Sequence, residues 1–234
     1  MVSFTGKILQ NRSRQEGSAV RAEIVKINSE SPESSLVKYA ADQIRAGEVL
    51  GMPTDTFYGL AADPFNLRAV DRVYDIKTRS RHKPLSLLIE SVDQAEELAK
   101  ALPEEFYALA RKYWPGPLTI IVKAGSRLPL KVTANTGNVA LRVPNAKIPL
   151  AVVTAAAIPI TATSANLSGA AECTSAEQVH AQLHGRINII VDGGTSPRDI
   201  PSTIIDLTDE GARWRVMREG AIPADEISTF FANG

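Results

Sequence analysis

Helix-like and strand-like segments are intermixed along this whole chain, which argues against an all-α or an all-β fold. Apolar residues first recur at the spacing of one helix face and then form a run of strand length (Val37, Ala40, Ala41 and Ile44, then 48–52). The same succession returns further along, where the strand-like runs are rich in β-branched residues. The sequence therefore predicts an α/β fold with a mixed, twisted sheet.

The remaining segments fall into the same two classes. Helices are predicted within 67–74, 95–102, 106–113 and 175–183, and strands within 85–89, 118–122, 139–143, 158–162, 187–191, 203–207 and 213–217. Three of these strands, including 48–52, end in small polar clusters, at 54–56, 163–166 and 192–195. Because ligands bind at strand ends in open α/β sheets, we expect these clusters to line one crevice.

The composition is ordinary for a globular protein, with 26 basic and 26 acidic residues among 234. Any affinity for nucleic acid must therefore come from local patches. No apolar stretch approaches the roughly 18 residues that cross a bilayer, and the first residues lack a signal-peptide core. We expect a cytoplasmic protein with a flexible tail at 1–20 and a single domain at 21–234.

The run 77–83 concentrates four lysines and arginines with a histidine, without an acid, between a predicted helix and a predicted strand. Such a run is either a solvated basic loop or part of an anion site. Lysine offers phosphate a point charge, and arginine grips phosphate or carboxylate in two places. Arg142 and Arg218 lie near the ends of strand-like runs and fit such a site, although a cross-strand ion pair and a solvated edge residue are their alternatives.

Several chemistries lack sequence support. The chain has no GxxxxGK[ST], GxGxxG, HExxH or GxSxG motif, so any nucleotide must be held in another way. The single cysteine, Cys173, excludes an internal disulfide and a zinc site built of cysteines alone. Cys173 with His180 or His184 could form a thiol nucleophile pair, but no third orienting group is evident.

The ordered set of motifs resembles the YrdC family of threonylcarbamoyl-AMP synthases over roughly residues 35–232. The matching stretches are Met52-Pro53-Thr54-Asp55-Thr56-Phe57-Tyr58-Gly59-Leu60, Lys77-Thr78-Arg79, Lys83-Pro84-Leu85, Trp114-Pro115-Gly116-Pro117-Leu118-Thr119, Val139-Ala140-Leu141-Arg142-Val143-Pro144, Ser164-Ala165-Asn166, Asp192-Gly193-Gly194, Pro201-Ser202-Thr203-Ile204-Ile205-Asp206 and Arg218-Glu219-Gly220. The resemblance implies an open α/β sheet with flanking helices and a large, positively lined concave cavity.

The family joins L-threonine, bicarbonate and ATP into threonylcarbamoyl-adenylate and releases pyrophosphate, so the resemblance implies a nucleotidyltransferase. A partner complex then transfers the threonylcarbamoyl group to the adenosine beside the anticodon of tRNAs that read codons beginning with A. No acidic metal-binding motif stands out in the chain, so Mg²⁺ is expected to be carried by the ATP phosphates. The resemblance implies no organic cofactor.

The resemblance also assigns residues. The family signature K-x-R then S-x-N falls on a catalytic set of Lys77, Arg79, Ser164 and Asn166. These four residues, with Arg81, Asn138 and Arg218, are the implied ATP ligands. The implied L-threonine ligands are Thr54, Ser86, Arg142, Ala162 and Ser202.

The chain departs from the usual family pattern at Ser80, Lys83, Asn138, Pro201 and Glu219, which bears on the ligand geometry. Two other interpretations remain. A basic concave surface also suits an RNA-binding or RNA-maturation factor, although the chain has no net charge and only 6% aromatic residues for base stacking. A relative that kept the fold but lost the chemistry is the other, and the intact signature argues against it.

Overall fold

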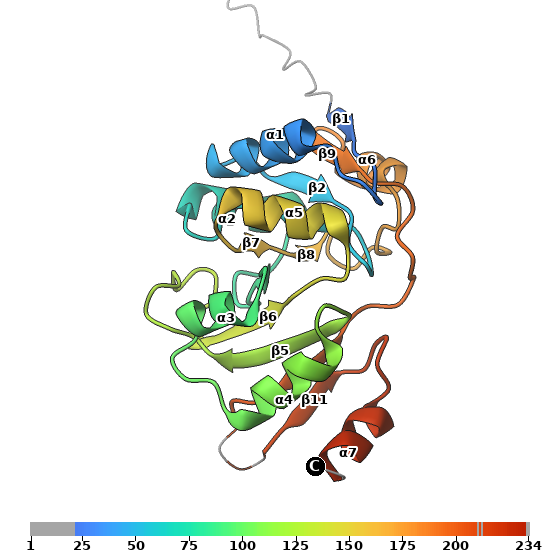
Figure 1. Cartoon of the computed structure of the whole chain (residues 1–234). Coiled ribbons are helices and arrows are strands. Elements are labelled where there is room, and N and C mark those ends of the chain that lie inside the picture. The colour runs from blue at the N-terminus through green and yellow to red at the C-terminus, as the bar shows by residue number, and fades with distance from the viewer. Residues whose placement is uncertain (1–21, 210, 212, 233–234) are drawn as a thin grey trace, which may run out of the picture.

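The computed structural model describes residues 22–209, 211 and 213–232, so the predicted tail at 1–20 lies outside the described residues (Figure 1). Helices and strands are intermixed along the described residues, as predicted. The strands are β1 (Glu23–Lys26), β2 (Leu50–Met52), β3 (Gly59–Ala61), β4 (Ser86–Leu88), β5 (Leu118–Lys123), β6 (Asn138–Arg142), β7 (Ile160–Thr161), β8 (Thr163–Ser164), β9 (Ile189–Asp192), β10 (Thr203–Asp206) and β11 (Arg215–Arg218). The helices are α1 (Ser34–Arg45), α2 (Leu67–Lys77), α3 (Val92–Leu98), α4 (Glu104–Tyr113), α5 (Lys147–Ala156), α6 (Ala176–Leu183) and α7 (Ala224–Ala232).

The described strands form two mixed sheets, where the sequence predicted one. The five-stranded sheet has the order β1-β9-β2-β3-β8, and the six-stranded sheet has the order β11-β10-β5-β6-β4-β7. The predicted strand 158–162 is the reason for the difference. Its residues Ile160–Thr161 pair with β4 in one sheet, and after Ala162 the chain pairs with β3 in the other.

Helices bury apolar faces against both sheets. The helix face predicted from Val37, Ala40, Ala41 and Ile44 is buried on α1, which lies beside α5 in Figure 1. Together with Leu50 of β2 these residues belong to one core cluster, which explains why α1 forms where its apolar spacing predicted a helix. No helix of the described part is long and apolar enough to cross a membrane.

Within the described residues, the chain passes between the sheets three times. It does so between β3 and β4, at Ala162 between β7 and β8, and between β9 and β10. The basic run 77–83 lies in the first of these connections and begins at the last residue of α2. These connections therefore bring distant segments to the junction of the two sheets.

Candidate functional site

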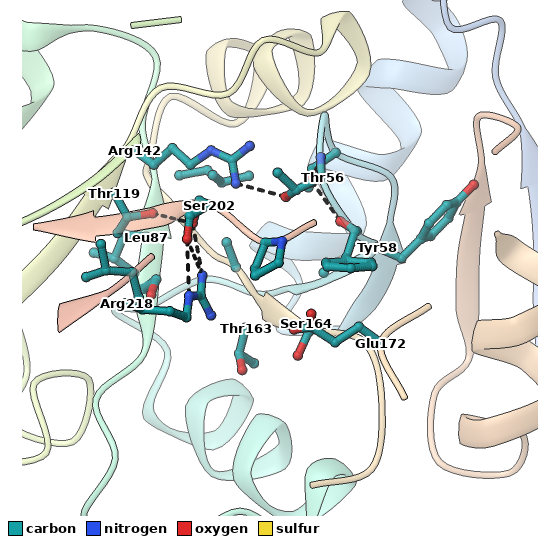
Figure 2. Close-up of a pocket in the computed structure, with 18 of the residues that line it drawn as sticks. Thr56, Tyr58, Leu87, Thr119, Arg142, Thr163, Ser164, Glu172, Ser202 and Arg218 are labelled. Carbon is teal, nitrogen blue, oxygen red and sulfur yellow. Dashed lines mark hydrogen bonds between the residues drawn. The ribbon is translucent and has the colours of Figure 1, made fainter. Parts of the chain in front are cut away.

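A cavity of about 180 Å³ lies at the junction of the two sheets (Figure 2). Each of the three connections between the sheets contributes to its wall, with Arg79 from the first, Ala162 from the second and Ser202 from the third. The cavity brings together eight of the residues assigned from sequence: Thr54, Arg79, Ser86, Arg142, Ala162, Ser164, Ser202 and Arg218. Four assigned residues do not line it: Lys77, Arg81, Asn138 and Asn166.

Lys77 is the last residue of α2, and its side chain is only 2% exposed. Its ammonium donates to the main-chain oxygen of Ser164 and, at 2.8 Å each, to the main-chain oxygen and Oδ1 of Asn166. Burial and then the charge of Arg79 lower the pKa of Lys77 to about 8, against an opposing effect of Glu172. Lys77 thus connects the end of α2 to the segment behind the cavity wall.

The conformation of Thr78 separates Lys77 from Arg79. Thr78 ends α2 in the left-handed region at φ 51°, so the chain turns sharply after Lys77. Arg79 then lines the cavity and donates to the main-chain oxygen of Pro84 at 3.1 Å. Beyond the wall, Ser164 Oγ donates to Asn166 Oδ1 at 2.7 Å, which orients the hydroxyl of Ser164 relative to Lys77. Of the four signature residues, Arg79 and Ser164 thus line the cavity, whereas Lys77 and Asn166 lie behind its wall.

Arg142, at the end of β6, is held by three protein groups. Its Nη2 pairs with Asp55, Nη1 donates to Thr56 Oγ1 at 3.0 Å, and Nε donates to the main-chain oxygen of Gly116 at 3.0 Å. Arg142 thus forms a buried ion pair, but not the cross-strand pair left open by the sequence, because Asp55 lies in the bend between β2 and β3. Because a guanidinium has five N–H donors, one N–H on each Nη atom is left for a ligand.

Arg218 and Ser202 form a second rigid unit of the wall. Arg218 Nη2 donates to the main-chain oxygen of Ser202 at 2.8 Å and to its Oγ at 3.1 Å, and Ser202 Oγ lies 2.8 Å from Thr119 Oγ1. Gly220 makes this approach feasible, because a Cβ there would lie 2.2 Å from the main-chain oxygen of Pro201. The sequence left open that Arg218 is a solvated edge residue, and it does lie on the edge strand β11. Its guanidinium nevertheless points into the cavity (Figure 2).

The structure places two assigned residues elsewhere. Arg81 is exposed and pairs with Asp71 and Asp75 on α2, so it faces away from the cavity. Asn138, at the start of β6, donates to Thr208 Oγ1 at 3.2 Å and lies at the opposite end of that strand from Arg142. Neither side chain belongs to the cavity wall.

The prediction that the three polar clusters line one crevice is wrong for the third cluster. Gly193 and Thr195 line a second cavity of about 420 Å³, which shares Thr54 with the first. The hydroxyl of Tyr58 fixes this arrangement by donating to the main-chain oxygen of Gly194 at 2.6 Å. The 192–195 segment is thereby turned toward the neighbouring cavity.

Sequence reasoning missed several wall residues, among them Thr119, Thr163 and Glu172. The two threonines had a signal, because each lies within a strand-end cluster or a matched motif. Glu172 had none, since it follows two alanines in a segment without clear periodicity. It is the only carboxylate among the described residues of this wall, which also holds three arginines.

The thiol alternative gains no support. Cys173 is fully buried and does not line the cavity, and burial raises the pKa of its thiol. His180 of α6 and His184, the residue directly after that helix, stack on each other with ring centroids 6.0 Å apart. The structure therefore leaves Cys173 as a buried apolar group.

Comparisons with known proteins agree with this geometry. Residues 42–220 match the family Sua5_yciO_yrdC, described as "Telomere recombination". The chain is 39% identical over 193 residues to a threonylcarbamoyl-AMP synthase of Pyrococcus abyssi and 38% identical over 192 residues to one of Bacillus subtilis, in each case across 82% of this chain.

These matches cover 56% and 55% of the relatives, so the chain spans little more than half their length. A crystal structure of P. abyssi Sua5 complexed with L-threonine superimposes with a TM-score of 0.85 at 37% identity. That superposition covers 89% of this chain and 61% of the other. The α/β architecture described above is therefore the architecture of these proteins.

Proposed function

The chain belongs to the Sua5/YciO/YrdC family, and we propose that it is an L-threonylcarbamoyladenylate synthase. In this reaction L-threonine and bicarbonate form a carbamate with loss of water. A carbamate oxygen then attacks the α-phosphorus of ATP. The bond to the β-phosphate breaks, pyrophosphate leaves, and threonylcarbamoyl-AMP remains. The names of the relatives and the threonine complex of a similar structure support the proposal.

One observation carries the proposal for this chain. The cavity at the sheet junction brings together arginines from three separate segments, Arg79, Arg142 and Arg218, with hydroxyls from both sheets. Attack of a carbamate on ATP brings two anions together, so preorganised cations lower the barrier. Positioning of both substrates at one junction supplies the rest of the rate increase, without a dedicated general base.

For L-threonine, we place the carboxylate on Arg142. The two N–H groups that Arg142 has left can bind a carboxylate in two places. The wall around Arg142 contributes the other residues assigned to threonine: Thr54, Ser86, Ala162 and Ser202. Since Thr54 Oγ1 already donates to the main-chain oxygen of Phe57 at 2.7 Å, it acts toward threonine as an acceptor.

For ATP, we assign the phosphates to Arg79, Ser164 and Arg218, which line the cavity. Lys77 and Asn166 support them from behind the wall, where Lys77 supplies a positive charge and Asn166 orients the hydroxyl of Ser164. Arg81 and Asn138 are omitted from the assignment because the structure directs their side chains to other partners.

Mg²⁺ bound to ATP would neutralise part of the phosphate charge. Among the described residues no group of three or more His, Cys, Asp or Glu side chains is placed to hold a metal ion. This donor set fits a metal that is carried mainly by the phosphates. The product would be consumed by a tRNA-modifying threonylcarbamoyl transferase, and we assign both steps to the cytoplasm, where ATP, threonine and tRNA are available.

The deciding experiment measures pyrophosphate release by the purified chain with ATP and Mg²⁺, with and without L-threonine and bicarbonate. Release that requires both additions supports the synthase. Pyrophosphate release that does not depend on L-threonine contradicts the synthase proposal. Binding of RNA that weakens steeply with salt, in protein without nucleotide chemistry, would instead favour the RNA-binding alternative.

A further inference from the structure

Glu172 is a carboxylate without a partner among the described residues, in a wall otherwise charged by arginines. No described residue forms a hydrogen bond or an ion pair with it, although Arg218 lines the same cavity. Glu172 and Ser164 both line the cavity, and in the view of Figure 2 they are drawn on the same side of it, away from Arg142. Its carboxylate is therefore available to a ligand on the side of the cavity where Ser164 lies.

The charge of Glu172 acts on two cations around the cavity, Lys77 and Arg218. Burial lowers the pKa of Lys77 and of Arg218, and Glu172 opposes the shift in each case. Glu172 is thus close enough to influence the cations that surround the proposed phosphate position. A negative charge there weakens an anion site unless something positive lies between the carboxylate and the phosphates.

We propose that Glu172 is a direct ligand of the divalent metal ion that arrives with ATP, so that the metal is shared between this carboxylate and the phosphates. The inference rests on the proposed function. Mg²⁺ is commonly bound by one or two carboxylates together with substrate phosphates, and Glu172 supplies one carboxylate where the described residues supply no larger cluster.

The ammonium group of L-threonine is the competing occupant, and the geometry disfavours it. The threonine carboxylate is assigned to Arg142, and the amino group of an α-amino acid is separated from that carboxylate by a single carbon. Since Glu172 lies on the side of the cavity away from Arg142 in the view of Figure 2, the amino group is held on the far side from it. The phosphates are assigned to the side of the cavity where Ser164 lies. They are therefore nearer to Glu172 than threonine is, and a cation can bind both the phosphates and Glu172.

The test measures metal binding directly. Mn²⁺ replaces Mg²⁺, and an ATP analogue with a methylene between the α- and β-phosphorus prevents turnover. Electron paramagnetic resonance and water-proton relaxation then report free Mn²⁺ and its bound waters for the whole chain, for Glu172→Gln and for Glu172→Asp. Glu177→Gln is the matched control, because Glu177 is exposed on α6 and does not line the cavity.

We expect Glu172→Gln to weaken binding of the Mn²⁺ complex by about tenfold or more and to increase the number of metal-bound waters. Glu172→Asp should recover part of the affinity, Glu177→Gln should match the original chain, and metal-free analogue should bind Glu172→Gln at least as well as the original chain.

Three results would overturn the inference. The first is equal Mn²⁺ affinity in Glu172→Gln and the original chain. The second is that Glu172→Gln binds the analogue more tightly than the original chain by the same factor with and without metal, since Glu172 would then only repel phosphate. The third is a loss of L-threonine binding with metal binding unchanged, which would assign Glu172 to the ammonium group. If the original chain bound no analogue at all, the synthase proposal would fall together with this one, and the pyrophosphate assay would show that failure separately.

Discussion

Lys77 donates hydrogen bonds to both oxygen atoms of Asn166, the main-chain carbonyl and Oδ1, each at 2.8 Å. A third donation reaches the main-chain oxygen of Ser164, so the three N–H donors of the ammonium are occupied within the protein. The lysine of the family signature therefore holds the other half of that signature in place. Toward the proposed ATP phosphates, Lys77 would contribute the positive charge of its ammonium close behind the wall.

Lys77→Ala is expected to cost both activity and stability. Pyrophosphate release should fall by at least about 100-fold, because Ser164 loses its fixed orientation and the site loses a charge. Removal of the ammonium also leaves buried oxygens of Asn166 and Ser164 unpaired, which should lower the free energy of unfolding by about 1–3 kcal/mol. Urea denaturation measures the second effect. Full stability in the variant would contradict the buried role that the structure gives Lys77.

The activity should decline as the pH rises through about 8, the pKa to which burial lowers Lys77. Below this pH the ammonium is charged and has three donors. Above it the neutral amine has two donors and no charge, so the site weakens. The basic limb of kcat/KM for ATP measures this pKa in the free enzyme. Because the charge of Glu172 raises the pKa of Lys77, Glu172→Gln should move that limb to lower pH.

The Asp55 and Arg142 pair predicts a large effect of single substitutions on stability. Arg142→Ala leaves a buried carboxylate without its cation, which should cost about 3–5 kcal/mol of unfolding free energy. The double variant Asp55→Asn with Arg142→Gln removes both charges and should lose less stability than the sum of its two single variants. Denaturant midpoints compare the original chain, Asp55→Asn, Arg142→Gln and the double variant. A double variant as unstable as the sum of the single ones would contradict the pairing.

Ser202, assigned to L-threonine, and Arg218, assigned to ATP, are expected to be energetically coupled through the contact between them. Ser202→Ala removes the hydroxyl that Arg218 and Thr119 share, and Arg218→Lys removes the planar fork that grips Ser202. Because each change disturbs the same contact, a double-mutant cycle on kcat/KM should give a coupling of about 0.5–3 kcal/mol. Additive losses would show that the two residues contribute independently.

Arg81→Ala is expected to leave catalysis nearly unchanged, in contrast to Arg79→Ala. Arg81 is exposed and paired with Asp71 and Asp75, so its removal should change stability by no more than about 0.5 kcal/mol. The KM for ATP, measured beside that of Arg79→Ala, separates the two arginines. A comparable loss in both variants would return Arg81 to the ATP site.

Local patterns predicted those parts of the fold whose apolar residues follow one period. Helix α1 has a single buried face and was predictable for that reason. Helix α5 was not, because its sequence, KIPLAVVTAA, is apolar on nearly every side and contains Pro149. Residues 158–162 were predicted as one strand, and the passage between sheets at Ala162 depends on pairing partners that are distant in sequence.

In the site, too, local sequence patterns predicted some features, whereas others depend on contacts between distant segments. The basic run 77–83 signalled an anion site, but all of its cations look alike in sequence. The turn at Thr78 separates them, so that Lys77 is buried, Arg79 lines the cavity and Arg81 pairs with α2. Glu172 could not be predicted, because only the folded chain places it in the same wall as the arginines.

The three passages of the chain between the two sheets all contribute to the cavity wall, through Arg79, Ala162 and Ser202. A molecule bound there makes contacts with both sheets at once and resists their relative rotation. Substrate binding should therefore reduce the mechanical compliance of the junction. ATP and threonine, bound together in the cavity as proposed, would then favour each other's binding through the rigidity that each imposes on the same joint.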